Sequence, residues 1–179
     1  MSRTRSMPAE WSPHTATWMG FPRDSYAESG LTREAAQSAW ASVANAVCEY
    51  EPVNMLCHHE DIGAAKSMLC DGVELIPVAL NDAWLRDIGP TFVVEDDSLV
   101  AIDWQFNGWG CNTELEWCLD DAIATKIAKL IDVPVERADI VNEGGGIHVD
   151  GRGTVLLTDT VQRLEEHTSE LQSPCNLVC

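Results

Sequence analysis

Strand and helix patterns alternate along the first half of the chain, and this alternation restricts the folds that it can adopt. Short apolar segments bounded by turn residues predict strands, and apolar residues three and four positions apart predict helices. The predicted strands are Thr15–Phe21, Val53–Cys57 and Val73–Val78, and the predicted helices between them are 33–50 and Asp61–Leu69. Such alternation favours an α/β protein in which helices cover a sheet.

The first predicted helix has both a start signal and an apolar face. Thr32 is placed to cap its N-terminus. Its apolar residues repeat at spacings of four and three, at Ala36, Trp40, Val43 and Val47. We therefore expect these four side chains to face the core.

The second half of the chain favours hairpins around one further helix. The predicted hairpins are Thr91–Glu95 with Leu99–Asp103, and Ile147–Asp150 with Thr154–Thr158. They turn at Asp96-Asp97 and at Gly151-Arg152-Gly153. The predicted helix is Leu119–Ile131, with an apolar stripe at Ile123, Ile127, Leu130 and Ile131. We expect residues 1–162 to belong to one domain.

The charge balance excludes several classes of partner. The 179 residues contain 11 Lys and Arg against 29 Asp and Glu, a formal net charge of −18. Nucleic acids and anionic membrane surfaces require surplus basic charge, so we expect neither as a partner. No apolar run is long enough for a membrane span, and Met1–Pro8 lacks an apolar signal core. We therefore expect a globular cytoplasmic protein.

The seven cysteines are expected to be reduced thiols. None forms a Cys-x-x-Cys pair, and the number is odd. Cys48, Cys57 and Cys70 lie in apolar, regular segments, where a free cysteine usually packs as a small hydrophobe.

The densest group of chemically active side chains lies in the loop Asn81–Pro90, between two predicted strands. Asp82 or Asp87 could bind a planar cation through two parallel hydrogen bonds, and the face of Trp84 could hold the same cation. Alternatively, Arg86 pairs with one of these carboxylates and merely ties the loop. The residues alone favour neither interpretation.

A second group surrounds three consecutive glycines in Asn142–Gly151. Glu143, which precedes them, could be a buried carboxylate that faces a ligand. His148 and Asp150 share a strand face and could bind a metal with His58 or His59, as in a metallohydrolase. Two ligands on a strand are weak evidence, so we favour packing or hydrogen bonding for His148 and expect no metal and no cofactor.

A third, aromatic group covers Asp103–Gly110. Its Asn and Gly residues predict a tight turn that could present Trp109 or Asn107 to a ligand. Core and loop packing is the simpler interpretation of these aromatic side chains.

Four ordered blocks together resemble one family, the agmatine deiminases of the bacterial-type peptidylarginine deiminase group. The resemblance runs from about Met7 to Gln162. The matching blocks are Met7-Pro8-Ala9-Glu10-Trp11 with Thr17-Trp18-Met19, Asn81-Asp82-x-Trp84-x-Arg86-Asp87-x-Gly89-Pro90, Asp103-Trp104-x-Phe106-Asn107-x-Trp109-Gly110, and Glu143-Gly144-Gly145-x-Ile147-His148-Val149-Asp150-Gly151.

The resemblance implies a fold and a reaction. The fold would be the pentein β/α-propeller, here incomplete, with about two to three of its five ββαβ units and with exposed edge strands. The reaction would be hydrolysis of agmatine to N-carbamoylputrescine and ammonia, a step of putrescine and polyamine biosynthesis, without cofactor. The partner would be a small cationic guanidino substrate, and the full-length protein could be a homo-oligomer.

The resemblance also implies residue roles. A cysteine thiolate would attack the guanidinium carbon, and a His would move protons. Asp87 would bind the guanidinium, Glu143 would contact the substrate or orient the His, and Trp84 would line the pocket. Asp82 is a weaker candidate for substrate binding.

The sequence departs from this family in two blocks and in its tail. The family's Gly-His-x-Asp block and its C-terminal cysteine after Gly-Gly do not occur, and His148, Cys175 and Cys179 are poor substitutes. Residues 163–179 resemble a translated sequencing-library adapter, so we expect a non-native tail on an N-terminal half that is inactive alone. The alternatives are a catalytically dead guanidinium-binding module, or a preference for arginine or peptidyl-arginine.

Overall fold

The computed structural model describes residues 5–23, 30–111, 116–158, 161 and 177–178. The chain divides into two compact units, and each is described by itself. The parallel-sheet unit comprises Pro13–Leu85 and Glu116–Asp120. The two-sheet unit comprises Met1–Ser12, Arg86–Leu115 and Asp121–Cys179.

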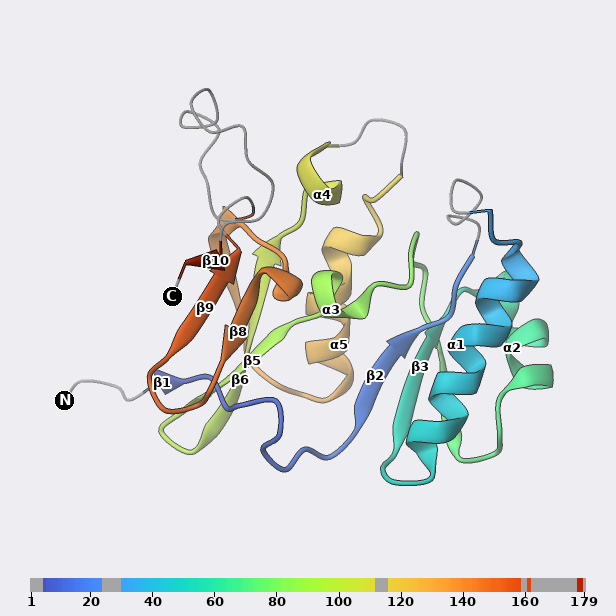
Figure 1. The fold of residues 1–179 in the computed structure, drawn as a ribbon, viewed down its shortest axis with the longest axis horizontal. Helices are drawn as coiled ribbons and strands as arrows, with labels where there is room; N and C mark the ends of the chain where they lie inside the picture. The colour runs from blue at the N-terminus through green and yellow to red at the C-terminus, as the bar shows by residue number, and fades with distance from the viewer. Residues whose placement is uncertain (1–4, 24–29, 112–115, 159–160, 162–176, 179) are drawn as a thin grey trace. The chain divides into compact units, whose positions relative to one another are not determined.

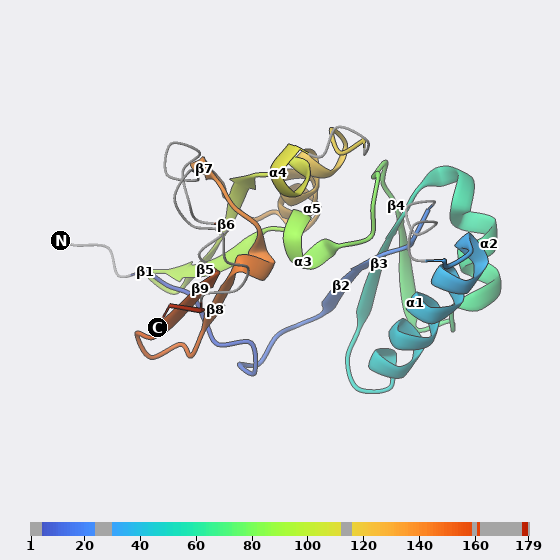
Figure 2. The same ribbon diagram turned by 45° about the horizontal axis from the view of Figure 1, so that its top comes forward.

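The parallel-sheet unit consists of two consecutive strand–helix–strand crossovers. Its strands are β2 (Thr17–Gly20), β3 (Val53–Cys57) and β4 (Val73–Pro77), and its helices are α1 (Arg33–Cys48) and α2 (Ile62–Met68). The strands are parallel in the order β2-β3-β4. Both helices lie on the same side of the sheet (Figures 1 and 2). The α/β prediction is confirmed here, with each predicted element present.

The core of this unit lies between the sheet and its two helices. Its buried members are Phe21, Ala44, Val53, Met55, Cys57, Ala65 and Val73. Strand β3 is the central strand and is buried over most of its length, which explains its continuous apolar run. Buried apolar area of this kind contributes roughly 25 cal/mol per Å² to folding.

Helix α1 begins as predicted but is rotated from the expected face. The side chain of Thr32 accepts a hydrogen bond from the Ala35 amide at 3.2 Å, as an N-cap should. The fully buried apolar positions are Ala36, Ala41 and Ala44, whereas Val43 is 54% exposed. The prediction for Val43 was therefore wrong, because small alanines allow the helix to pack closely on β3.

The larger sheet of the two-sheet unit combines antiparallel and parallel strands. Its strands are β1 (Arg5–Ser6), β5 (Thr91–Glu95), β6 (Ser98–Gln105) and β7 (Val135–Val141), in the order β1-β5-β6-β7. The predicted β5–β6 hairpin is confirmed, and it turns at Asp96 and Asp97 with positive φ angles of 47° and 65°. Helix α5 (Ile123–Leu130) connects β6 to the parallel strand β7.

Helix α5 follows a short 3-10 turn at Asp120–Ala122, and both lie within the predicted helix Leu119–Ile131. Ile123 and Ile127 are buried as expected. Leu130 is 52% exposed and Ile131 is also exposed, so the prediction of a four-residue apolar stripe was wrong at its C-terminal end. Helix α5 ends at Leu130, and its last turn is buried only at Ile127 and Ala128.

The smaller sheet is antiparallel and contains the second predicted hairpin. It consists of β8 (Ile147–Val149), β9 (Val155–Thr158) and β10 (Leu177–Val178), in the order β10-β9-β8. Both glycines of the β8–β9 turn have positive φ, 69° at Gly151 and 105° at Gly153. The predicted non-native tail, 163–179, lies outside the described residues except for β10. Two further short helices are α3 (Leu85–Ile88), in the 81–90 loop, and α4 (Gly108–Cys111), at the end of the 103–110 block.

Candidate functional site

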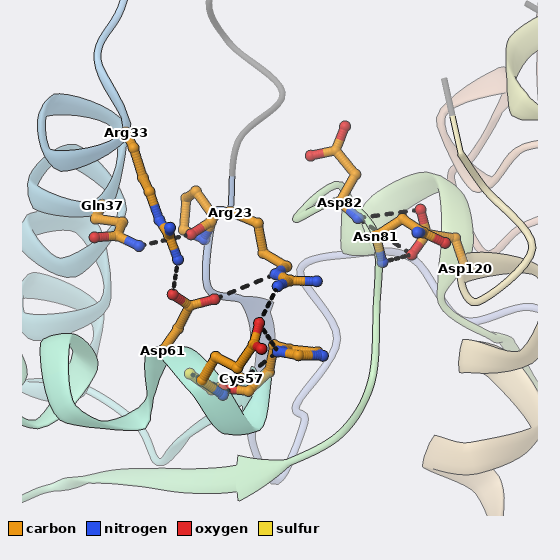
Figure 3. A network of polar contacts seen from close by, with 11 residues as sticks. Arg23, Arg33, Gln37, Cys57, Asp61, Asn81, Asp82 and Asp120 are labelled. Carbon is orange, nitrogen blue, oxygen red and sulfur yellow. Dashed lines mark hydrogen bonds and ion pairs between the residues drawn. The ribbon is translucent and has the colours of Figure 1, made fainter. Parts of the chain in front are cut away.

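The loop that follows β4 is anchored by a buried carboxylate. The side chain of Asp120 is almost fully buried and accepts the backbone N–H of Asn81 at 2.7 Å. It also accepts the N–H of Asp82 at 3.1 Å (Figure 3). In return, Asn81 Oδ1 accepts the Leu119 amide at 2.9 Å. These bonds link the two segments of the parallel-sheet unit and fix the path of the loop.

The first two candidate residues, Asp82 and Trp84, lie in this anchored loop. Asp82 is buried, and its Oδ1 accepts the Ala83 N–H at 2.6 Å. Trp84 is 42% exposed and packs edge-on against Trp40, with 5.4 Å between ring centroids. The loop backbone at Ala83 passes close to Gly20, the last residue of β2. A Cβ at Gly20 would lie 2.9 Å from the Cα of Ala83, so glycine makes room for the loop. Trp84 thus keeps a large part of its ring accessible.

The third candidate, Asp87, lies in the two-sheet unit, where three sequence blocks meet at its carboxylate. Trp109 Nε1 donates to Asp87 Oδ2 at 3.1 Å, and the Gly145 amide donates to Asp87 Oδ1 at 3.0 Å. Each carboxylate oxygen has a second lone pair, so these two bonds leave acceptor capacity. Residues from the 103–110 and 142–151 blocks therefore bind the carboxylate that the 81–90 block supplies, although the three blocks are far apart in sequence.

Glycine is required beside Asp87 because the backbones approach closely. A Cβ on Gly144 would clash with the backbone oxygen of Arg86, and a Cβ on Gly145 would clash with Asp87 Oδ1. The flexible backbone of the glycine block thus serves close approach and amide donation, not phosphate binding.

Trp109 is held in an uncommon conformation. Its φ of 56° and ψ of 47° lie in the left-handed region, which side chains other than Asn, Asp and Gly rarely adopt. Phe106 packs edge-on against its ring at 5.0 Å, and Asn107 Oδ1 accepts the Gly110 amide at 2.9 Å. The turn therefore directs the Trp109 N–H to Asp87.

The fourth candidate, Glu143, is close enough to Asp87 to feel its charge. Burial raises the pKa of Glu143, and the negative charge of Asp87 raises it further. A cation bound beside both carboxyl groups would oppose this shift, because its charge favours the ionised form of Glu143. The structure thus brings Asp87 and Glu143 together in the two-sheet unit, whereas Asp82 and Trp84 belong to the other unit.

Arg86 forms its ion pair with Glu10, at 2.5 Å between Nη2 and Oε1. The same Glu10 oxygen lies 3.6 Å from Nδ1 of His148, which is exposed. The guanidinium of Arg86 is therefore turned to the N-terminal segment, and Asp87 is held by neutral N–H donors instead. This arrangement argues against the interpretation that an Arg86–Asp87 pair ties the loop.

Asp150, considered above as a metal ligand, forms a turn. Its Oδ1 accepts the amides of Arg152 at 2.7 Å and Thr154 at 3.0 Å, which lowers the pKa of its carboxyl. Among the described residues, no group of three His, Cys, Asp or Glu side chains could hold a metal ion. Nor does any helix within the described ranges have the length and apolar character to span a membrane.

Two contributions to these loops were not found from the sequence. The segment containing Asp120 was interpreted as an ordinary helix, although its carboxylate anchors a loop 38 residues earlier. The Trp109 turn was identified, but its partner was not. The consecutive acidic residues Asp120 and Asp121 were the only sequence signal for this anchor, and they did not indicate which backbone groups they bind.

The chain resembles known proteins over most of its length. The family model for Porphyromonas-type peptidyl-arginine deiminase matches residues 6–173. A Streptomyces coelicolor protein provisionally named an agmatine deiminase is 48% identical over 161 residues, which cover 89% of this chain and 48% of that protein. The agmatine deiminase of Stutzerimonas stutzeri is 40% identical over 161 residues, 86% of this chain and 43% of its own length.

Solved structures show the same relationship. An agmatine deiminase of Enterococcus faecalis, described as catalysing its reaction, superimposes with a TM-score of 0.78 at 32% identity, over 94% of this chain and 47% of that one. A substrate-bound C. jejuni agmatine deiminase carrying C315S has a TM-score of 0.73 at 26% identity, over 86% of this chain and 45% of its own. This chain thus spans about half the length of the relatives that it matches.

Proposed function

Because this chain belongs to the Porphyromonas-type peptidyl-arginine deiminase family, we propose that it forms the carboxylate-bearing part of an agmatine deiminase. The reaction is hydrolysis of agmatine to N-carbamoylputrescine and ammonia. The observation that carries the proposal is the convergence on Asp87 of Trp109, Gly145 and the half-buried Glu143. The relatives' names supply the substrate, and the acid pair supplies a reason for it.

The acid pair suits a planar cation. A guanidinium presents several N–H donors in one plane, and a carboxylate can accept two of them in parallel. Trp109 and Gly145 fix the plane of Asp87, so its remaining lone pairs point in defined directions. A bound cation would also lower the pKa of Glu143, which burial and Asp87 raise.

The chemical step needs groups that the motif blocks of this chain do not supply. A thiolate adds to the guanidinium carbon, the C–N bond breaks, and ammonia leaves with a proton delivered by a general acid. Water then attacks the amidino carbon and releases the thiolate. We propose that Asp87 and Glu143 hold and polarise the guanidinium during both steps. The family resemblance implies that the thiol and the proton-transferring His would lie outside the motif blocks that this chain contains.

We propose that the chain corresponds to about two to three of the five pentein units, and that it binds but does not turn over agmatine. Specificity for agmatine over arginine or peptidyl-arginine would depend on groups that contact the amine end of the substrate. Trp84, with its accessible ring, is our candidate for a residue that lines the pocket, and Asp82 is a weaker candidate for substrate binding.

Calorimetric titration of the chain with agmatine tests the proposal. We expect binding heat with the wild type, a loss for Asp87→Asn and a smaller loss for Glu143→Gln, because the Asp87 carboxylate is the one held in position by Trp109 and Gly145. The exposed Asp71 provides a control, since Asp71→Asn removes the same charge elsewhere. No heat from the folded wild type, or equal losses in all three variants, would contradict the site. Ammonia release at enzyme-like rates would contradict the claim that the chain alone is inactive.

The expected origin of the tail is tested by sequencing the gene across the codons for 155–179. Our proposal requires the reading frame to continue past Gln162 into Gly-His-x-Asp and Gly-Gly…Cys blocks. An encoded stop directly after Cys179 would instead favour the guanidinium-binding module without catalysis.

A further inference from the structure

Two cysteines of the parallel-sheet unit lie near the C-terminal end of helix α1. Cys48 is the last residue of α1, and Cys70 lies in the turn between α2 and β4. Asn45, one turn before Cys48, holds this turn from two sides. Its Nδ2 donates to the Met68 carbonyl, and its Oδ1 accepts the Cys70 amide, both at 2.9 Å. The backbone of Cys70 is thereby fixed against the last turn of α1.

The Cys48 thiol lies against the same turn. The side chain of Cys70 is near enough to contribute to the raised pKa of Cys48. Gly72 leaves room for this thiol, because a Cβ at Gly72 would lie 2.5 Å from the Cys48 sulfur. Cys48 is partly buried and Cys70 is exposed, and both are reduced in this structure. The site thus consists of one accessible thiol and a second, partly buried thiol at the same turn.

We propose that Cys48 and Cys70 are an oxidation site that closes to a reversible disulfide when the protein meets a small-molecule disulfide. The arrangement resembles an attacking thiol and a resolving thiol, in which the accessible cysteine reacts first. Cys70 is the attacking group because it is exposed. Cys48 is the resolving group because its partly buried thiol lies against Gly72, in the turn that carries Cys70.

The reaction balances without any further reagent. The Cys70 thiolate attacks one sulfur of the small disulfide, a mixed disulfide forms, and one small thiolate leaves. The Cys48 thiolate then attacks the Cys70 sulfur and releases the second small thiolate. The two protons of the protein thiols end on the two small thiols. The protein is oxidised by two electrons, and the small disulfide is reduced by two.

The Cys48 thiol becomes easier to ionise as this reaction proceeds. Burial raises the pKa of Cys48, and the nearby Cys70 side chain raises it further. Once Cys70 is joined to the small thiol, it carries no charge, so the second cause disappears. Cys48 then ionises more readily at the moment when it is needed as a nucleophile.

The disulfide would join the end of α1 to the turn between α2 and β4. It closes a loop, Glu49–Leu69, that contains β3 and α2, the central strand and the second helix of the parallel-sheet unit. Closing such a loop restricts the unfolded chain, so we expect a higher melting temperature for the oxidised form. Adding dithiothreitol should restore the original melting temperature.

The test uses oxidised glutathione, followed by acid quenching, N-ethylmaleimide and tryptic mass spectrometry. Trypsin cuts after Lys66 and so separates Cys48 from Cys70. We expect peptides 34–66 and 67–86 to be joined, with fragment ions that assign the bond to Cys48 and not to Cys57, which shares the first peptide. Accumulation of glutathionylated Cys70 beside alkylated Cys48 in the wild type would overturn the proposal.

Three variants sharpen this test. Cys48→Ser should trap glutathione on Cys70, because the resolving thiol is missing, whereas Cys70→Ser should leave Cys48 reduced. Cys118→Ser removes another exposed thiol and should leave the Cys48–Cys70 bond unchanged. Formation of a Cys70–Cys118 bond at a comparable rate would mean that the arrangement at the end of α1 does not direct the oxidation. The wild-type peptide result is decisive even if a variant fails to fold.

Discussion

Replacing Asp120 by Ala should destabilise the parallel-sheet unit and release the loop that carries Asp82 and Trp84. Asp120 accepts two backbone donors, the N–H groups of Asn81 and Asp82. An unsatisfied buried donor costs about 1–3 kcal/mol, so the two together give a loss of about 2–6 kcal/mol. The lower half of this range is expected, because Asn81 is only partly buried and water can replace one bond. The melting temperature of a chain of this size should then fall by roughly 5–15 °C.

Thermal unfolding followed by circular dichroism measures this loss, and amide hydrogen exchange locates it. Asp120→Asn should lie between Ala and wild type, because Oδ1 accepts both amides and can be kept as the Asn oxygen. Asp71→Ala, at an exposed position of equal charge, is the control and should change the melting temperature little. The reasoning is refuted if Asp120→Ala melts with the control, or if exchange at Asn81 and Asp82 is not accelerated.

Three further predictions concern the acid pair, the glycine block and the core. The pKa of Glu143 is raised in the folded state, so its contribution to stability is present below the ordinary Glu pKa and is lost as pH rises through the folded-state pKa. Urea titrations should therefore show Glu143→Gln gaining stability relative to the wild type between acid and neutral pH. A stability difference that stays constant over this range would contradict the prediction. Gly144→Ala should lower the free energy of unfolding by about 1–3 kcal/mol, because its Cβ clashes with the Arg86 backbone. The control Gly63→Ala, whose Cβ meets open space in α2, should raise it by about 0.5–1 kcal/mol. Equal denaturation midpoints for the two variants would count against the close approach at Gly144. Burial raises the pKa of Cys57 to about 12, so stability should decline as pH rises from about 9 towards 12, and this part of the decline should be missing in Cys57→Ala.

Local patterns predicted the fold where the burial of an element follows its own sequence. Strand β3 and the β5–β6 turn are examples, since a continuous apolar run and an Asp-Asp turn are signals within a few residues. Strand β7 was missed because Val135–Val141 contains three charged residues and is mostly exposed, and only its hydrogen bonds to β6 make it a strand. Val43 was misplaced because the rotation of α1 depends on the alanines that meet β3, which the helix sequence alone cannot specify.

The candidate acids were chosen from the sequence, but their arrangement was not. Asp87 and Glu143 were selected in separate blocks, and nothing local to either indicated that the Gly145 amide would lie on the Asp87 carboxylate. The role of Trp109 was equally hidden, because a left-handed turn decides where its N–H points. Whether these acids bind substrate stays a prediction. Their proximity is set by long-range contacts, which short-range patterns do not encode.

The two hydrogen bonds on Asp87 have a consequence for the entropy of binding. A free aspartate samples several rotamers, and immobilising a side chain of this kind when a ligand arrives costs about 0.5–1.5 kcal/mol. Trp109 and Gly145 restrict Asp87 during folding, with one oxygen held from each side. A cation that reaches this carboxylate therefore meets an acceptor of fixed direction, and little conformational freedom is left to lose.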